Sequence, residues 1–403
     1  MRASSPKSIV AKLAVCQMLL LTNGVLLAAV NALAGFALAP SRRLATIPVV
    51  TYVLGAALST LPASFFMKHH GRRAGFLLGS SLGVVGGAVG ALAIQTHSFL
   101  LLLAGTFLSG IYNAFGQYYR FAAADAAPPD FKSRAISLTL AGGIVGGFIG
   151  PAVGRLTRDL VEPQFLASYV GLAVFALASL LMATRLRFPT QSEAERHGTG
   201  RPLRAILRQP AVVVAVLAAA VGYGVMNLLM SATPLAMDLC CGHPFADMTF
   251  VLQWHVIGMF APSFFAGALI RRAGVLNVML AGAALMFVCM GIAMSGHSFM
   301  HFWWALTLLG VGWNFLYIGG TTLLTEAHSP AEKAKVQGVN DCLVFVVMVS
   351  SSLTSGVVVT GSGGWGMLAQ LTLPFLALTT LATAILWLRE RRTAAPHRAS
   401  TPP

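Results

Sequence analysis

The sequence predicts an all-α integral membrane protein with twelve transmembrane helices in two six-helix pseudo-repeats. Composition is the first reason, since 56% of the 403 residues are apolar and only 10% are charged, unlike a soluble globular chain. The second is that twelve apolar stretches approach or exceed the ~20 residues that a spanning helix needs. The third is an internal repeat with an offset of about 200 residues. A β-barrel would need short alternating strands, which the sequence does not show.

The twelve stretches divide into two groups of six around a polar segment. In order they cover residues 12–38, 45–67, 74–95, 98–124, 134–157, 164–184, 210–237, 247–270, 275–296, 300–325, 336–360 and 367–388. We therefore expect an N-terminal half at 1–184, a cytoplasmic linker at 185–209, a C-terminal half at 210–388 and a cytoplasmic tail at 389–403.

Two stretches carry features of their own. Lys7 and Lys12 precede the first, as in a signal sequence, but its length and the eleven stretches that follow indicate a retained helix. The fifth is rich in glycine, which fits helices that pack closely through small faces. Its glycines are Gly142, Gly143, Gly146, Gly147, Gly150 and Gly154.

The basic residues predict the orientation in the membrane. If the N-terminus is cytoplasmic, only Arg42, Arg43, Arg155 and Arg158 of the 27 Lys and Arg fall on the outer side. The positive-inside rule therefore predicts that both termini lie in the cytoplasm. The basic runs at 68–73, 185–208 and 389–398 are interpreted as topology signals that contact lipid headgroups, so the net charge of +15 does not indicate nucleic acid.

The repeat relates loops and helix ends of the two halves. Residues 125–134 align with 326–335 at offset 201, and Tyr112 and Asn113 match Trp313 and Asn314 at the same offset. The loop at 68–73 matches the one that ends at Gly274, at offset 203. Two homologous six-helix halves follow from this pattern.

At these residues the chain resembles the major facilitator superfamily. Gly71, Arg72 and Arg73 match the loop motif that follows the second helix in that superfamily, whereas Lys68 and His69 replace its Asp and Arg. The resemblance implies that the first, fourth, seventh and tenth helices line a central cavity. It implies that the third, sixth, ninth and twelfth face lipid.

Two pairs of soft-metal ligands lie on the predicted seventh and eighth helices. Met226 and Met230, and His255 and Met259, stand at i and i+4, so each pair shares a helix face. Met226 lies ~16 residues, or ~24 Å, from the inner start of its helix, and His255 ~15 residues, or ~22 Å, from the inner end of its own. Thioether and imidazole favour Cu(I), and a His inside a membrane span is more often functional than not.

The predicted ninth helix also carries methionines at i, i+4 and i+8, which we call the methionine ladder. We interpret it as apolar packing, because that helix is expected to be peripheral. Its residues are Met286, Met290 and Met294.

Around both ligand pairs the chain resembles the CcoA-like copper importers of bacteria. The similar stretches are 222–237, 253–262, 117–125 and 312–326. The resemblance implies import of copper across the bacterial inner membrane, as substrate rather than prosthetic group, for assembly of cytochrome c oxidase. Periplasmic and cytoplasmic copper carriers would be partners, and we expect a monomer. A related branch of that family is thought to move riboflavin, so the motifs leave the substrate open.

Further donors follow the seventh helix at the predicted periplasmic mouth. Met237, Cys240, Cys241 and His243 could capture copper and pass it inward, or they could form an ordinary surface loop. The cysteines are expected to be free thiols rather than a disulfide framework.

Four charged residues are candidates for gating or ion coupling, namely Arg120, Asp125, Glu326 and Asp341. Their depth favours gating ion pairs, with Arg120, Arg134 or Lys335 as the cations. No ATP-binding loop, hydrolytic triad or zinc protease motif is present, so we expect a secondary transporter and not an enzyme.

Two alternatives remain open at this point. One is a transporter of an organic solute such as riboflavin, or a drug/proton antiporter, with Tyr112, Tyr118, Tyr119, Trp254 and Trp313 as cavity contacts. The other is a membrane protein that senses copper without transporting it.

Overall fold

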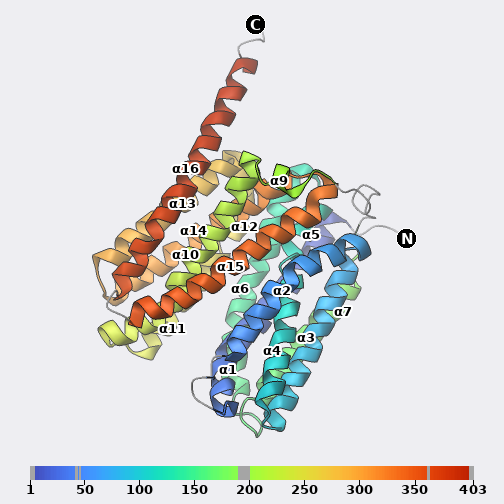
Figure 1. Ribbon diagram of the computed structural model, residues 1–403, viewed down its shortest axis with the longest axis vertical. Helices are drawn as coiled ribbons and strands as arrows, with labels where there is room; N and C mark the ends of the chain where they lie inside the picture. Colours follow the sequence, from blue (N-terminus) through green and yellow to red (C-terminus); the bar gives the residue numbers. More distant parts are fainter. Residues whose placement is uncertain (1–4, 41–43, 45–46, 189–199, 361–363, 399–403) are drawn as a thin grey trace. The chain divides into compact units, whose positions relative to one another are not determined.

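A computed structural model describes residues 5–40, 44, 47–188, 200–360 and 364–398, and all regular structure within them is helical (Figure 1). Twelve helices or helix pairs are long and apolar enough to cross a membrane. The predicted fold class is therefore confirmed.

The first six spans contain seven of the helices. They are α1 (Pro6–Leu38), α2 (Ile47–His70), α3 (Arg72–Gln95), α4 (Phe99–Gly116) with α5 (Tyr119–Ala126), α6 (Lys132–Thr157) and α7 (Leu166–Thr184). The short α9 (Leu203–Ile206) precedes the second group. That group contains α10 (Pro210–Cys241), α11 (Phe245–Phe260) with α12 (Ser263–Ala273), α13 (Val275–Ser295), α14 (Phe299–Glu326), α15 (Lys333–Thr360) and α16 (Gly364–Arg398).

Three of these elements differ from the uninterrupted stretches that hydropathy predicts. The fourth span breaks at Gln117 and Tyr118, between α4 and α5. The eighth span breaks at Ala261 and Pro262, where the proline has no N–H to continue the helical ladder. The last helix continues to Arg398, past the predicted end at residue 388.

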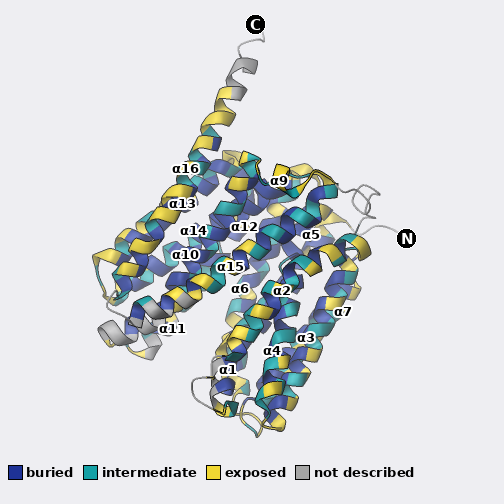
Figure 2. Cartoon of the chain, in the orientation of Figure 1, coloured by how far each residue is buried: buried dark blue, intermediate teal, exposed yellow. Residues whose placement is uncertain are grey.

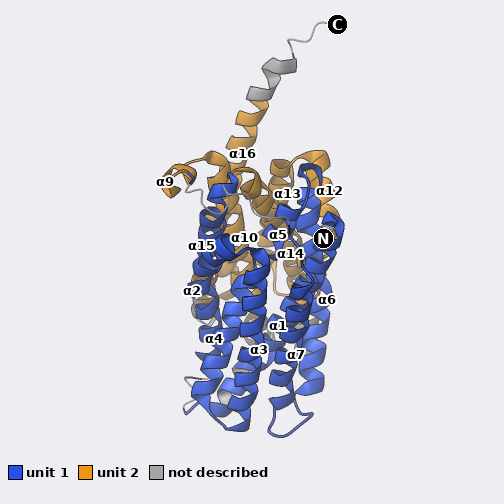
Figure 3. Ribbon diagram, turned by 90° about the vertical axis from the view of Figure 1, so that its right-hand side faces the viewer, with its two compact units in different colours: residues 1–200, 329–345 blue, residues 201–328, 346–403 orange. Residues whose placement is uncertain are grey.

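The described chain forms two compact units, coloured separately in Figure 3. The first comprises residues 1–200 and 329–345, and the second comprises 201–328 and 346–403. Helix α15 contributes to both, because its first part packs with the first unit. The halves expected from the repeat, 1–184 and 210–388, stay a sequence-based division.

Glycine allows equivalent helices to cross closely in each unit. In the first unit, a Cβ on Gly55 would meet the Phe107 carbonyl oxygen, and one on Gly110 would meet that of Tyr52. In the second unit, a Cβ on Gly258 would lie 2.6 Å from the Thr307 carbonyl oxygen, and one on Gly310 2.5 Å from that of His255. The crossing of α2 and α4 thus recurs between α11 and α14, about 200 residues further on.

The repeat also shows in the turns between spans. Gly71 begins α3 with φ of 86°, and Gly274 begins α13 with φ of 89°. Both values lie where a side chain is strained, so glycine is needed at both turns.

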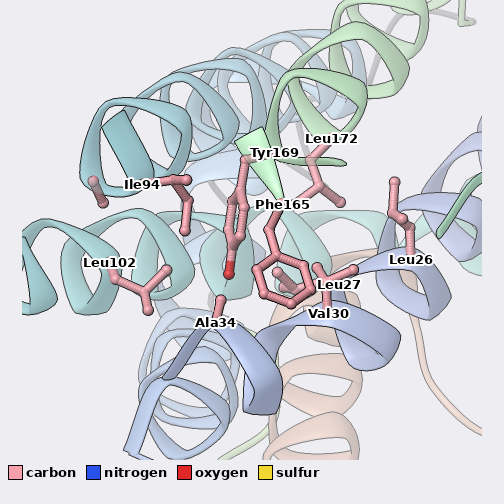
Figure 4. Close-up of a cluster of buried hydrophobic side chains, with 10 residues drawn as sticks. Leu26, Leu27, Val30, Ala34, Ile94, Leu102, Phe165, Tyr169 and Leu172 are labelled. Atoms are coloured by element: carbon pink, nitrogen blue, oxygen red, sulfur yellow. The ribbon is translucent and has the colours of Figure 1, made fainter. Parts of the chain in front are cut away.

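Small residues and one apolar cluster hold the first unit together. Gly142 and Gly146 of α6 face the backbone of α1 at Ala14 and Met18, where a Cβ would clash. Figure 4 shows a buried cluster in which Tyr169 and Phe165 pack among leucines of α1 and α7. The Tyr169 hydroxyl donates a hydrogen bond to Asn31 Oδ1 at 3.1 Å, so the polar end of this ring is also satisfied.

Candidate functional site

Helix α14 is the scaffold of the candidate site in the second unit. It is buried along most of its length (Figure 2), and both α10 and α11 pack against it. Gly222 of α10 meets Leu316, and a Cβ on Gly320 would lie 2.9 Å from the Ala215 carbonyl oxygen. Side chains from three helices therefore meet around α14.

His255 lies on the α11 side of this scaffold and is fully buried. Its Nδ1 is 2.7 Å from the Leu306 carbonyl oxygen. Since a carbonyl oxygen can only accept, Nδ1–H donates this bond, and the lone pair of the neutral ring lies on Nε2. That Nε2 is buried and has no hydrogen-bond partner among the described residues.

The predicted methionine ligands lie on two different helices beside α14. Met259 is buried on α11, and its carbonyl oxygen accepts a 2.6 Å hydrogen bond from Asn314 Nδ2. Met226 is buried on α10, and Met230 is partly exposed. Within the described ranges, no group of three or more His, Cys, Asp or Glu side chains could hold a metal. A cation shared by the four predicted ligands stays a prediction.

The donors predicted at the outer mouth have other contacts where the structure describes them. Met237 is buried, and its carbonyl oxygen accepts from the His243 backbone N–H at 3.1 Å. His243 Nε2 lies 3.1 Å from the His297 carbonyl oxygen. The side chains of Cys240 and Cys241 are outside the described residues.

The methionine ladder on α13 packs inside the second unit at two of its three positions. Met286 and Met290 are fully buried, and the Met290 sulfur accepts a 2.9 Å hydrogen bond from Thr372. Met294 is 42% exposed.

Four aromatic rings from three helices form a cluster beside α14. Trp313 and Tyr317 stack with their centroids 5.0 Å apart and an interplanar angle of 18°. Tyr223 of α10 presents its edge to both, at 5.1 Å and 5.0 Å. Phe260 of α11 lies 5.9 Å from Trp313. We call these four residues the aromatic cluster.

Sequence reasoning identified Trp313 but missed Tyr223, Phe260 and Tyr317. The i, i+4 spacing of Trp313 and Tyr317 was a usable signal, because it places both rings on one face. Trp254, also predicted, packs instead against Trp303 at 5.5 Å and is 36% exposed.

The predicted aromatic contacts of the first unit are fully buried and belong to its internal packing. Tyr118 donates a 2.8 Å hydrogen bond to the Thr60 carbonyl oxygen. Tyr119 packs on Phe76 at 4.7 Å, and the Tyr112 ring lies where a Cβ on Gly83 would be.

Buried polar atoms accompany the aromatic cluster. Trp313 Nε1, Asn314 Oδ1 and Thr321 Oγ1 are buried without a partner in the part of the chain that the structure describes. Residues 313, 317 and 321 are spaced by four and share one helix face. The region therefore combines aromatic rings with buried hydrogen-bonding atoms.

The predicted gating residues lie in the first unit, except Glu326. Asp125 on α5 binds Arg72 of α3 and Lys333 of α15, each at 3.0 Å. Neither cation is among those expected from the sequence, which are Arg120, Arg134 and Lys335. Arg72 also donates to Gln337 Oε1 at 2.7 Å, which ties α3 to α15.

Arg120, one of the three cations expected from the sequence, pairs with Asp341. Arg120 Nη2 binds Asp341 Oδ1, and both side chains are almost fully buried. Glu326 ends α14 and is exposed, so it does not belong to this buried group.

The family model of the Major Facilitator Superfamily matches residues 13–338. The chain therefore belongs to this superfamily and is a multi-pass secondary transporter of its type. Transporters of this superfamily are not enzymes. Among curated proteins, it is 39% identical over 386 residues to the riboflavin transporter RfnT of Brucella anthropi, covering 95% of this chain and 96% of the relative. It is also 26% identical to the uncharacterized MFS-type transporter YdeG of Bacillus subtilis, covering 86% and 84%.

Solved structures share the fold. FucP in its outward conformation superposes with a TM-score of 0.76 at 16% identity, covering 93% of this chain and 98% of FucP. The proton:xylose symporter XylE gives a TM-score of 0.78 at 13% identity, covering 95% of each chain. At such identities the likeness concerns the fold alone.

Proposed function

We propose that this protein imports riboflavin across the bacterial inner membrane. The observation that carries the proposal is the 39% identity to a riboflavin transporter, which extends over almost the whole of both chains. This reading corresponds to the organic-solute alternative of the sequence analysis rather than to its copper reading.

The aromatic cluster is the part of the second unit that suits such a solute. The isoalloxazine ring of riboflavin is planar and heteroaromatic, so it stacks on or meets the edges of aromatic side chains. Tyr223 is the partly exposed member of the cluster, and the buried Trp313 and Tyr317 support it. Trp313 Nε1 and Thr321 Oγ1, which share one helix face with Tyr317, supply a donor and a hydroxyl group for the ring's polar edge.

Uptake of labelled riboflavin tests the proposal. In bacteria that can neither make nor import riboflavin, expression of the wild-type chain is expected to restore growth on low riboflavin and uptake of the label. Tyr223→Ala removes about 1 kcal/mol of aromatic contact, so KM is expected to rise about fivefold. Trp254→Phe, which preserves an aromatic ring away from the cluster, is the control and is expected to transport like wild type. Absence of uptake by the wild-type chain would refute the proposal.

Copper import is a second candidate, favoured by one observation. His255 has a buried Nε2 lone pair with no partner among the described residues, and imidazole is a ligand for copper. Copper uptake by the same cells separates the two candidates. Copper accumulation that depends on His255 and Met259, with no riboflavin uptake, would replace the riboflavin proposal.

A further inference from the structure

Arg120 and Asp341 form an almost fully buried ion pair, with 2% and 3% of their side chains exposed. Both partners of Asp341 use the same carboxylate oxygen: Oδ1 accepts from Arg120 Nη2 and, at 2.8 Å, from Asn340 Nδ2. Oδ2 is buried and receives no hydrogen bond from any described residue. Oδ1 of this carboxylate thus accepts both hydrogen bonds, and Oδ2 has a lone pair available for a proton.

Asp125 is a useful contrast in the same unit. Its Oδ2 contacts two cations, Arg72 and Lys333, and 23% of its side chain is exposed. Two neighbouring cations favour the charged form of this carboxylate. Asp125 therefore suits a permanent structural contact, whereas Asp341 does not have a second cation at hydrogen-bonding distance among the residues described.

The surroundings of Asp341 allow the pair to separate. The charged groups that act on it are the guanidinium groups of Arg120 on α5 and Arg72 on α3, and Tyr118 is its titratable neighbour. Arg120 Nη1 also donates to the carbonyl oxygen and to Oε1 of Gln117, each at 3.1 Å. If Asp341 becomes neutral, Arg120 keeps these acceptors and is not left without a partner.

A path toward Asp341 starts at a small pocket, with room for about one water molecule, between α2, α3 and the start of α15. Arg72 lines this pocket and donates to Gln337 Oε1 at 2.7 Å. Gln337 precedes Asp341 by four residues, so both lie on one face of α15. Gln337 Nε2 is itself buried with no partner among the described residues, which continues the line of polar atoms from the pocket to Asp341.

We propose that Asp341 binds the proton whose movement drives transport, and that Oδ2 is the atom that receives it. The proton converts the carboxylate into a neutral carboxylic acid, and the ionic attraction between Arg120 and α15 is lost. Release of the same proton on the other side restores the carboxylate and the pair. This proposal rests on the proposed function for the identity of the transported solute. The protonation of Asp341 does not depend on that identity.

Infrared spectroscopy of the purified full-length protein, without solute, tests the protonation directly. As the pH is lowered, the wild-type protein is expected to gain the carbonyl band of a buried protonated carboxyl group. Asp341→Asn is expected to lack this band, and the control Asp125→Asn to retain it. An unchanged band in Asp341→Asn would overturn the proposal. Because that variant leaves Arg120 without its counter-ion, the double variant Arg120→Gln/Asp341→Asn, in which both charges are removed, provides the same test if the single variant does not fold.

Transport in proteoliposomes is the second measurement. With a pH gradient imposed, the wild-type protein is expected to concentrate labelled riboflavin, and Asp341→Asn to lose this accumulation while it still exchanges internal for external riboflavin. Accumulation driven by the pH gradient in Asp341→Asn would overturn the proposal. If the wild-type protein moves no riboflavin, the proposed function fails, and the infrared result still decides the role of Asp341.

Discussion

The two nitrogens of the His255 ring have different surroundings. Nδ1–H donates to the Leu306 carbonyl oxygen and so contributes to the packing of α11 on α14, whereas Nε2 contributes nothing to that contact. A buried polar group that loses its hydrogen bond costs about 1–3 kcal/mol. Structural and substrate roles of this residue can therefore be separated by removing one nitrogen at a time.

His255→Asn retains a donor near the position of Nδ1 and removes Nε2. We expect the thermal stability of the detergent-purified protein to stay near that of wild type, and riboflavin uptake to be unchanged. His255→Leu, which removes both nitrogens, is the comparison and is expected to lower the stability by about 1–3 kcal/mol. Loss of copper uptake in His255→Asn, at normal stability, would show that Nε2 binds the metal instead.

The charged residues show where sequence reasoning at this scale succeeds and where it ends. The sequence predicts Arg120 and Asp341 as members of a group of gating residues, because ionisable side chains inside spans seldom occur unpaired. It does not predict which carboxylate binds which cation. The pairing of Asp341 with Arg120, and of Asp125 with Arg72 and Lys333, depends on how α3, α5 and α15 pack. Aromatic rings are harder still, because the only local signal for Tyr317 was its i, i+4 spacing from Trp313, and Tyr223 and Phe260 lie on other helices.

At the scale of elements, the close crossing of α11 and α14 depends on two glycines. A Cβ at Gly310 would lie 2.5 Å from the His255 carbonyl oxygen and 2.8 Å from the Met259 nitrogen. Both are backbone atoms, which cannot move aside as a flexible side chain does. The equivalent crossing of α2 and α4 has the same requirement at Gly110.

Gly310→Ala is therefore expected to force α11 and α14 apart and to destabilise the protein by about 1–3 kcal/mol, the usual cost of overpacking. Thermal unfolding of the purified protein measures this change. Gly291→Ala is the matched control, because a Cβ there has no atom within 4 Å and alanine favours the helix. Equal stability of the two variants would contradict the close crossing.

The helices themselves could be predicted from sequence, because a long apolar run in a membrane protein has few alternatives to a helix. Their interruptions are less visible. Pro262 marks the break between α11 and α12, but nothing as explicit marks the break at Gln117 and Tyr118. The end of α16 at Arg398 was also missed, since hydropathy reports where a span leaves the apolar layer and not where the helix stops.

At the scale of the whole molecule, the distribution of basic residues determines the orientation that we propose. Only four of the 27 Lys and Arg lie on the side opposite to the termini. Such an asymmetry favours retention of the basic loops in the cytoplasm during insertion. Twelve candidate spans make an even number of crossings, which agrees with the proposed orientation in which both termini lie on one side.

Reporter fusions test this orientation. A fluorescent protein that matures only in the cytoplasm, fused after Pro403, is expected to be bright, and alkaline phosphatase at the same position to be inactive. Fusion within the loop near Arg158, which lies after the fifth span, is expected to give the opposite result. An active phosphatase after Pro403 would reverse the proposed orientation.

The aromatic cluster has a photophysical consequence. Electron-rich tyrosine and tryptophan rings quench the emission of an excited isoalloxazine by transferring an electron to it, and Tyr223 has Trp313 5.1 Å behind it. Under the proposed function, a riboflavin molecule held against Tyr223 is therefore expected to be non-fluorescent. Free riboflavin in solution is fluorescent. Loading and release by the unlabelled transporter thus become visible as a fall and a recovery of green fluorescence.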